Sequence, residues 1–137
     1  MKMNNRLPNM ELKFSIQVVG DESKMNWVGD FLFGRPTLKE RAMIEVMKAR
    51  LNGDLFSIDP ETRAYNDAIS FLKFTLRESP DWWKDSDFGS NLYDANVVIE
   101  IYNKCIDFEA AWRKKVYGEK DQNEVQKPVM DSTESGS

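Results

Sequence analysis

The sequence predicts an α+β protein that is mostly helical, with a small N-terminal β-hairpin packed on three helices. Three observations lead to this prediction. Apolar residues alternate from Glu11 to Val19 with the period of two that is typical of a half-buried strand. Three later segments carry apolar residues at helical spacing, between recognisable caps and breakers. The chain has 137 residues, 41% of them hydrophobic, which is enough for one domain with one core.

The predicted hairpin comes first. The apolar face of its first strand consists of Leu12, Phe14, Ile16 and Val18. A turn follows at Gly20–Ser23, and Met25–Phe33 can return as the second strand. Trp27 and Phe31 share one face of that strand, and Gly29 between them favours a bulge or a bend. Since an isolated hairpin is marginally stable, we expect it to pack on helices.

The first helix has clear signals at both ends. Thr37 and Glu40 are spaced as a capping box, in which each side chain accepts from the other residue's backbone amide. Pro36 keeps the helix from extending backwards, and Asn52-Gly53 provides the stop. The residues that recur at helical spacing are Leu38, Ala42, Met43, Val46, Met47 and Leu51.

Two further helices are predicted. The second begins at Asp59-Pro60, with Asp59 as the cap, and must end before Ser79-Pro80. A loop with aromatic residues then lasts to Ser90 or Asn91. The third helix runs from about Leu92 to Val116 and ends at Gly118. Its predicted apolar side is Ala95, Val98, Ile99, Tyr102, Ile106 and Trp112.

The charge distribution separates a body from a tail. Residues 1–10 are predicted to be a flexible leader, 11–118 a single domain, and 119–137 an acidic disordered tail. The net charge of the whole chain is −4, and the body is close to neutral without a basic stripe. Because binding to nucleic acid needs clustered Lys and Arg, this charge pattern argues against a nucleic-acid partner. No apolar run could span a membrane, so we expect a soluble intracellular protein.

The sequence offers no enzyme site. Histidine is absent, which removes the commonest general base, and no phosphate-binding loop or nucleophile elbow is found. Cys105 has no histidine to activate it and is expected to be a small buried hydrophobe. Asp81, Asp85 and Asp87 do not follow the calcium-loop spacing. We therefore predict no catalytic, cofactor-binding or metal-binding residue; a small hydrolase that uses carboxylates alone is a remote alternative.

Interaction with another protein is the remaining class of function. The chain has more large aromatic residues than a small hairpin and three helices need. We expect Phe31 and Trp112 to lie in the core. Two adjacent tryptophans in a loop cannot easily both point inward, so one of Trp82 and Trp83 is expected to face a partner or a second copy. The candidate partner-binding residues are Trp27, Phe33, Trp82 and Trp83. The third helix has more apolar width than one neighbour covers, and an apolar groove would suit an amphipathic helical client.

Three segments of the chain carry a resemblance to a known family. They are WVGDFLFGRPT (Trp27–Thr37), which leads into a helix, RESPDWW (Arg77–Trp83) after the second helix, and DFEAAWRKKVYG (Asp107–Gly118) at the end of the third. In this order they resemble the tail assembly chaperones of long-tailed bacteriophages. The resemblance covers about Leu12 to Gly118. The positions that match the family's pattern are Trp27, Phe31, Arg35, Trp82 and Trp83.

The resemblance implies a binding protein that is not an enzyme. It would act in the cytoplasm of the bacterial host, keep the tape-measure protein soluble and promote assembly of the tail tube. It implies no cofactor. A longer form made by frameshifting would contact the tail tube protein, and the chain could also form a homo-oligomer. The alternative is a small structural phage protein, such as a head–tail connector or a tail terminator subunit.

Overall fold

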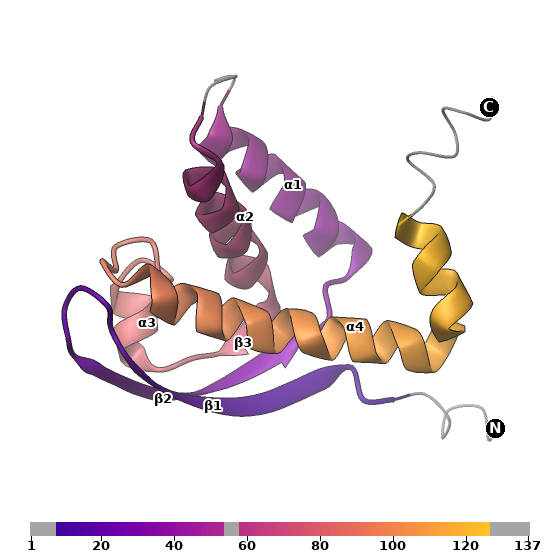
Figure 1. Ribbon diagram of the computed structural model, residues 1–137, viewed down its shortest axis with the longest axis horizontal. Coiled ribbons are helices and arrows are strands. Elements are labelled where there is room, and N and C mark those ends of the chain that lie inside the picture. Colours follow the sequence, from indigo (N-terminus) through magenta and orange to yellow (C-terminus); the bar gives the residue numbers. More distant parts are fainter. Residues whose placement is uncertain (1–7, 54–57, 127–137) are drawn as a thin grey trace. The chain divides into compact units, whose positions relative to one another are not determined.

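The computed structural model describes residues 8–53 and 58–126 and has the predicted α+β architecture, with helices predominating (Figure 1). The chain divides into two compact units, Met10–Cys105 and a smaller one that includes the chain from Ile106 onward. The boundary falls within the predicted single domain, 11–118. The predicted leader falls mostly on residues 1–7, which lie outside the described part of the chain.

A three-stranded antiparallel sheet forms the base of the larger unit. Strands β1 (Glu11–Val19) and β2 (Asn26–Gly34) make the predicted hairpin, and β3 (Leu76–Glu78) pairs with the other edge of β2. Phe14 is opposite Phe31 across β1 and β2, so the alternating apolar residues of both strands share one face. The strand β3 was not predicted, because its three residues are too few to show an alternating pattern.

The predicted bulge at Gly29 is wrong. Gly29 pairs with Ile16 without a register shift, and the irregularity of β2 lies instead between Leu32 and Phe33, where it faces β3. A side chain at Gly29 would place its Cβ 2.6 Å from Cγ of Pro80. The glycine is therefore needed because another part of the chain passes close to the strand.

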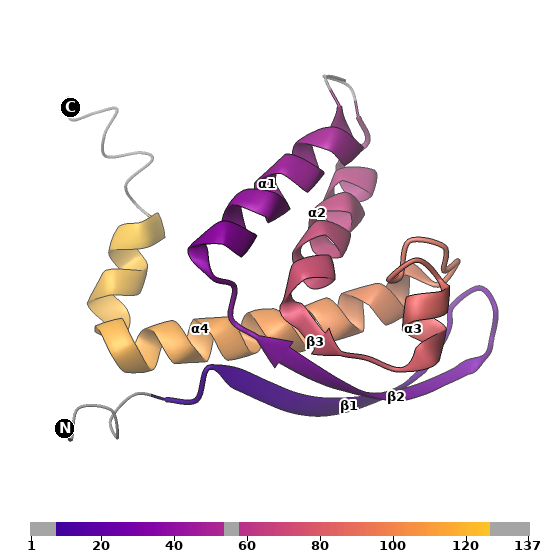
Figure 2. The ribbon, with the colours of Figure 1, turned by 180° about the vertical axis from the view of Figure 1, so that it is seen from behind.

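Helices α1 (Leu38–Asn52) and α2 (Pro60–Thr75) lie side by side as a helical hairpin in both views of the ribbon (Figures 1 and 2). The capping box of α1 is confirmed: Thr37 Oγ1 accepts from the Glu40 amide at 3.1 Å, and Glu40 Oε1 accepts from the Thr37 amide at 2.9 Å. Asp59 caps α2 as expected. The second helix ends at Thr75, because the chain turns into β3 there. This end comes before the Ser79-Pro80 pair that was expected to stop the helix.

A short helix and a long one complete the described part of the chain. The predicted loop after Pro80 contains the helix α3 (Asp81–Asp85), which sequence reasoning missed. Helix α4 (Ala95–Gln126) begins three residues later than predicted, and Gly118 breaks it with a φ of 86°. The backbone is again helical to Gln126, whereas the tail was predicted to begin at 119. Residues 127–137 lie outside the described residues, so disorder there stays a prediction.

The predicted apolar side of α4 is partly wrong. The buried residues of α4 in the larger unit are Val97, Val98, Ile101 and Cys105. Ile99 and Tyr102 are half-buried. The polar residues Asn96, Glu100 and Lys104 share one side of this helix, and the apolar face that remains is wide enough for more than one buried stripe. The burial of Cys105 is confirmed, as is that of Trp112 in the smaller unit.

Candidate interaction surface

Three of the four predicted partner-binding residues lie in one aromatic cluster. The ring centroids of Trp27 and Trp82 are 4.8 Å apart, and those of Trp82 and Trp83 are 6.2 Å apart. Phe31 lies 6.0 Å from both Trp82 and Trp83, in edge-to-face geometry. The fourth residue, Phe33, packs elsewhere, against Phe71 at 5.9 Å. The cluster therefore joins the middle of β2 to α3.

The burial of these residues corrects the prediction. Phe33 and Trp83 are fully buried, so neither can touch a partner in this structure. Phe33 is on the same face of β2 as Phe31, and the Trp83 ring lies directly over Gly89, where a Cβ would overlap it. Both side chains belong to the core of the larger unit.

Trp27 and Trp82 are half-buried, and the indole N–H of each donates a hydrogen bond within the molecule. The Trp82 indole donates to the carbonyl oxygen of Val28 at 2.9 Å, and the Trp27 indole donates to Asp94 at 2.8 Å. A buried indole usually finds such a partner. Only the exposed edges of these two rings remain for contact with another molecule.

Asp94 is a buried carboxylate that holds the tip of the β1–β2 hairpin. It accepts hydrogen bonds from the Glu22 and Ser23 amides, both at 2.8 Å, from Ser23 Oγ at 2.6 Å and from Trp27. These hydrogen bonds, above all those from Ser23, hold the pKa of Asp94 well below its usual range. All of its contacts are within the chain, and it therefore has a structural role. Asp94 was not predicted as a structural residue, because the sequence pattern placed it inside the third helix, which begins only at Ala95.

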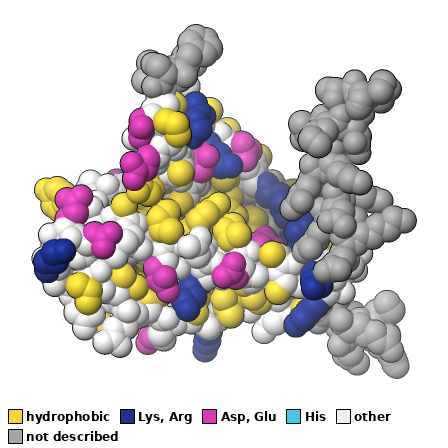
Figure 3. Space-filling view, in the orientation of Figure 1, with side chains coloured by type: hydrophobic (Ala, Val, Ile, Leu, Met, Phe, Trp, Pro, Cys, Tyr) yellow, Lys and Arg dark blue, Asp and Glu magenta, His cyan; other side chains and the backbone are white. Residues whose placement is uncertain are grey.

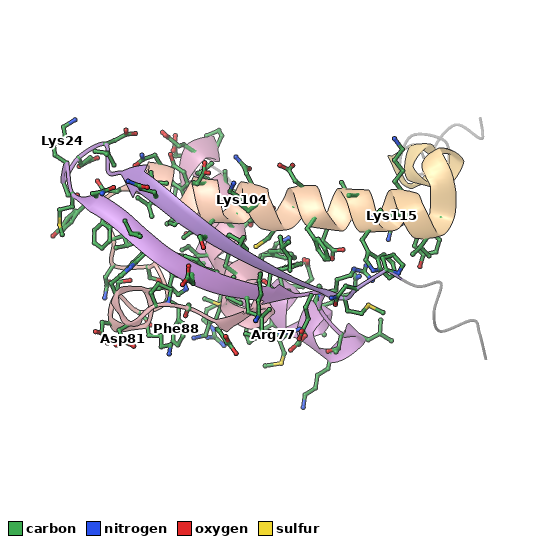
Figure 4. All side chains as sticks on the ribbon, turned by 90° about the horizontal axis from the view of Figure 1, so that it is seen from below. Lys24, Arg77, Asp81, Phe88, Lys104 and Lys115 are labelled. Atoms are coloured by element: carbon green, nitrogen blue, oxygen red, sulfur yellow. The ribbon has the colours of Figure 1, made fainter. Side chains whose placement is uncertain are left out.

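Arg77 connects four elements at the other end of the sheet (Figure 4). From β3, its guanidinium forms a two-fold ion pair with Glu40 of α1, at 2.7 and 2.9 Å. It also donates to the carbonyl oxygens of Phe74 in α2 at 2.8 Å, Gly34 in β2 at 3.3 Å and Arg35 at 3.0 Å. The Arg77 hydrogen bonds lower the pKa of Glu40 to about 2. This contact fixes the start of α1 relative to the sheet.

Much of the apolar side of α1 is exposed. Only Ile44 and Asn52 of this helix are buried, although its sequence has an apolar stripe. The exposed fractions are 84% for Leu38, 40% for Met43 and 60% for Val46. The stripe thus predicted the helix correctly, but much of it faces outward rather than into the core.

The part of this stripe from Ala42 to Met47 forms one wall of an apolar groove with a volume of about 420 Å³. We call it the α1 groove. The other walls come from α2 and from the loop after α3, where Phe88 is labelled in Figure 4. Its main lining residues are Met43, Val46, Met47, Ile69, Phe74 and Phe88. Apolar side chains also gather on the face seen in Figure 3, where the α1–α2 hairpin meets the first part of α4.

Neither a metal-holding group nor a membrane span is found in the described residues. Within residues 8–53 and 58–126, no three acidic, cysteine or histidine side chains are grouped so that they could hold a metal ion. In the same ranges, no helix is both long and apolar enough to cross a bilayer. An apolar groove can bind the apolar face of another chain, and this is the activity that the arrangement supports best.

Comparison of the chain with protein-family models, with curated proteins and with solved structures found no match.

Proposed function

We propose that this protein is a tail assembly chaperone of a long-tailed bacteriophage, which binds the tape-measure protein and keeps it soluble. The observation that carries the proposal is the outward-facing apolar stripe of α1 and the groove beside it. A folded chain seldom leaves such a surface unless something binds there. On this proposal the protein acts in the bacterial cytoplasm, is not an enzyme and needs no cofactor.

The apolar lining of the α1 groove suits a helical client with an apolar face. A helix with its side chains is about 10–12 Å across, and such clients lay apolar residues at helical spacing into an apolar groove. Met43 and Met47 line the groove, and flexible methionine side chains adapt to different apolar partners. A tape-measure protein is a long, largely helical chain, and many chaperone copies could bind along it.

Two of the three segments that carry the family resemblance contact each other. Trp27 packs against Trp82 with the two rings tilted by 50°, and Arg77 donates to the carbonyl oxygen of Arg35. These contacts connect the two segments, Trp27–Thr37 and Arg77–Trp83, and together they position α1 on the sheet. This supports a structural role for the shared motifs and leaves α1 as the surface for the client.

Co-expression with a candidate tape-measure protein tests the proposal. We expect the client to stay soluble and to elute with this protein in size-exclusion chromatography. A client that stays insoluble, with no complex detected, would contradict the proposal.

Mass spectrometry of purified virions distinguishes the structural alternative. A chaperone is absent from the finished particle, whereas a head–tail connector or a tail terminator subunit is retained in it. Peptides of this chain at a stoichiometric level in virions would favour the structural component.

A further inference from the structure

The charges on α1 indicate what kind of segment the α1 groove binds. The larger unit, Met10–Cys105, is acidic overall, with sixteen acidic side chains against twelve basic ones. Helix α1 has the opposite balance, with four basic and two acidic side chains. The apolar stripe thus lies on a locally basic helix within the acidic larger unit.

Both acids of α1 are already paired within the chain. Glu40 is held by Arg77, and Glu45 lies 3.3 Å from Lys48 on the next turn. The side chains of Lys39, Arg41 and Arg50 have no acidic partner in the part of the chain that the structure describes. The positive charge of α1 is therefore available to an external partner.

Two basic side chains lie at the α1 groove itself. Arg50 of α1 and Lys73 of α2 are both exposed and both line it. The Lys73 ammonium lies 4.4 Å from the ring centroid of Phe88, which keeps it beside the apolar floor. Asp87 is the acidic residue among the lining side chains. The lining thus combines apolar side chains with a net positive charge.

We infer that the α1 groove selects apolar helical segments whose flanking positions are acidic. Apolar residues of the client would contact Met43, Val46 and Phe88, while its Glu or Asp side chains would pair with Arg50 and Lys73. Opposite charges at the rim of an interface favour the matching partner and disfavour the wrong one. This inference rests on the proposed function and names the class of client segment.

Binding of two synthetic helical peptides to the full chain tests the inference. Both peptides have about 20 residues and the same leucine face, with glutamate at the remaining positions of one and lysine at those of the other. Fluorescence anisotropy would give the dissociation constants. We expect the glutamate peptide to bind roughly five- to tenfold more tightly at low salt, with the difference shrinking as the salt concentration rises.

Charge reversal at the groove provides the matched comparison. The double variant Arg50→Glu/Lys73→Glu should lose the preference for the glutamate peptide. Lys24→Glu/Lys104→Glu changes the net charge equally at two lysines outside the groove lining (Figure 4), and should keep it. Equal binding of both peptides, or equal loss in both double variants, would overturn the inference.

Two further outcomes separate this inference from the proposed function. If both peptides bind at the groove with equal affinity, the charge selection is wrong while the chaperone proposal stands. If neither peptide binds, and the chain instead binds vesicles of anionic phosphatidylglycerol through Arg50 and Lys73, the occupant is a membrane surface and the inference is wrong.

Discussion

Single residues of the aromatic cluster differ in what they contribute. Trp83 is fully buried, and its indole nitrogen has no hydrogen-bond partner among the described residues, so its contribution is packing alone. Trp82 is half-buried and combines ring contacts with a hydrogen bond to Val28. Adjacent in sequence, the two tryptophans therefore have distinct roles.

Substitution of these two tryptophans should show the difference. Trp83→Ala leaves a large core cavity, and we expect it to lower the free energy of unfolding by about 3–5 kcal/mol. Trp82→Ala should cost about 1–2 kcal/mol, since part of its ring is already in water. Denaturant unfolding measures both values, with Trp82→Phe as a control that keeps most of the ring contacts. Equal large losses would mean that both rings are core.

The carboxylates of Asp94 and Glu40 should make the stability depend on pH. Both have folded-state pKa values below their usual values, that of Glu40 at about 2. Each therefore stabilises the fold fully above its unfolded pKa of roughly 4, and this contribution is lost as the pH falls through the folded pKa. We expect the free energy of unfolding to decrease from about pH 4 towards pH 2.

Asp94→Asn tests the origin of this decrease. The variant should be less stable than the natural chain at pH 7, and its stability should change less between pH 4 and pH 2. Unfolding curves by circular dichroism at several pH values give both quantities. An unchanged pH dependence in the variant would show that other carboxylates cause the acid sensitivity.

At the scale of elements, the ion pair between Arg77 and Glu40 attaches α1 to the sheet. A two-fold, charge-assisted pair with less than a third of each side chain exposed is stronger than an ordinary surface pair. A double-mutant cycle with Arg77→Met and Glu40→Gln should give a coupling energy of about 1–2 kcal/mol.

The pair between Lys104 and Glu100 is the control for this cycle. It is longer, at 3.8 Å, and both side chains are 44% exposed. Its coupling energy should be below about 0.5 kcal/mol. If the two cycles gave the same value, Arg77 would not have the connecting role assigned to it.

Elements with strong local signals could be predicted from the sequence. The alternation in β1, the capping box of α1 and the Asp59-Pro60 start of α2 are set by neighbouring residues, and the structure has all three. The strand β3 forms because it pairs with the edge of β2, and α3 forms where Trp83 packs into the core. Such features depend on contacts distant in sequence, so no local pattern contains them.

The candidate site was predicted only in part for the same reason. Aromatic content drew attention to Trp27 and Trp82 but did not predict that they contact each other, and it could not show that Phe33 and Trp83 are fully buried. The apolar residues of α1 recur at helical spacing in the sequence. This spacing alone does not show whether the apolar face of a helix contacts the core or a partner. The partner of Asp94 is the hairpin turn, more than seventy residues away in sequence.

At the scale of the whole molecule, the proposed chaperone binds its client through α1. The contacts between α1 and the sheet hold this helix in place. Folding and client binding should therefore be separable. Substitutions at the aromatic cluster or at Arg77 should reduce stability, whereas substitutions at exposed positions of the α1 groove should reduce binding and leave stability nearly unchanged.

The most direct test is client binding by two matched double variants. Met43→Gln/Val46→Gln changes two exposed apolar residues at the groove, and Val19→Gln/Val28→Gln changes two residues of similar exposure on the hairpin. Neither pair alters the net charge, so the outcome is independent of the charge selection inferred above. Calorimetric titration with the tape-measure protein gives the dissociation constants. We expect binding to be roughly a hundredfold weaker for the groove pair, because about 3 kcal/mol of apolar burial is lost, and unchanged for the hairpin pair. Unchanged binding by the groove pair, with its fold intact, would contradict the account.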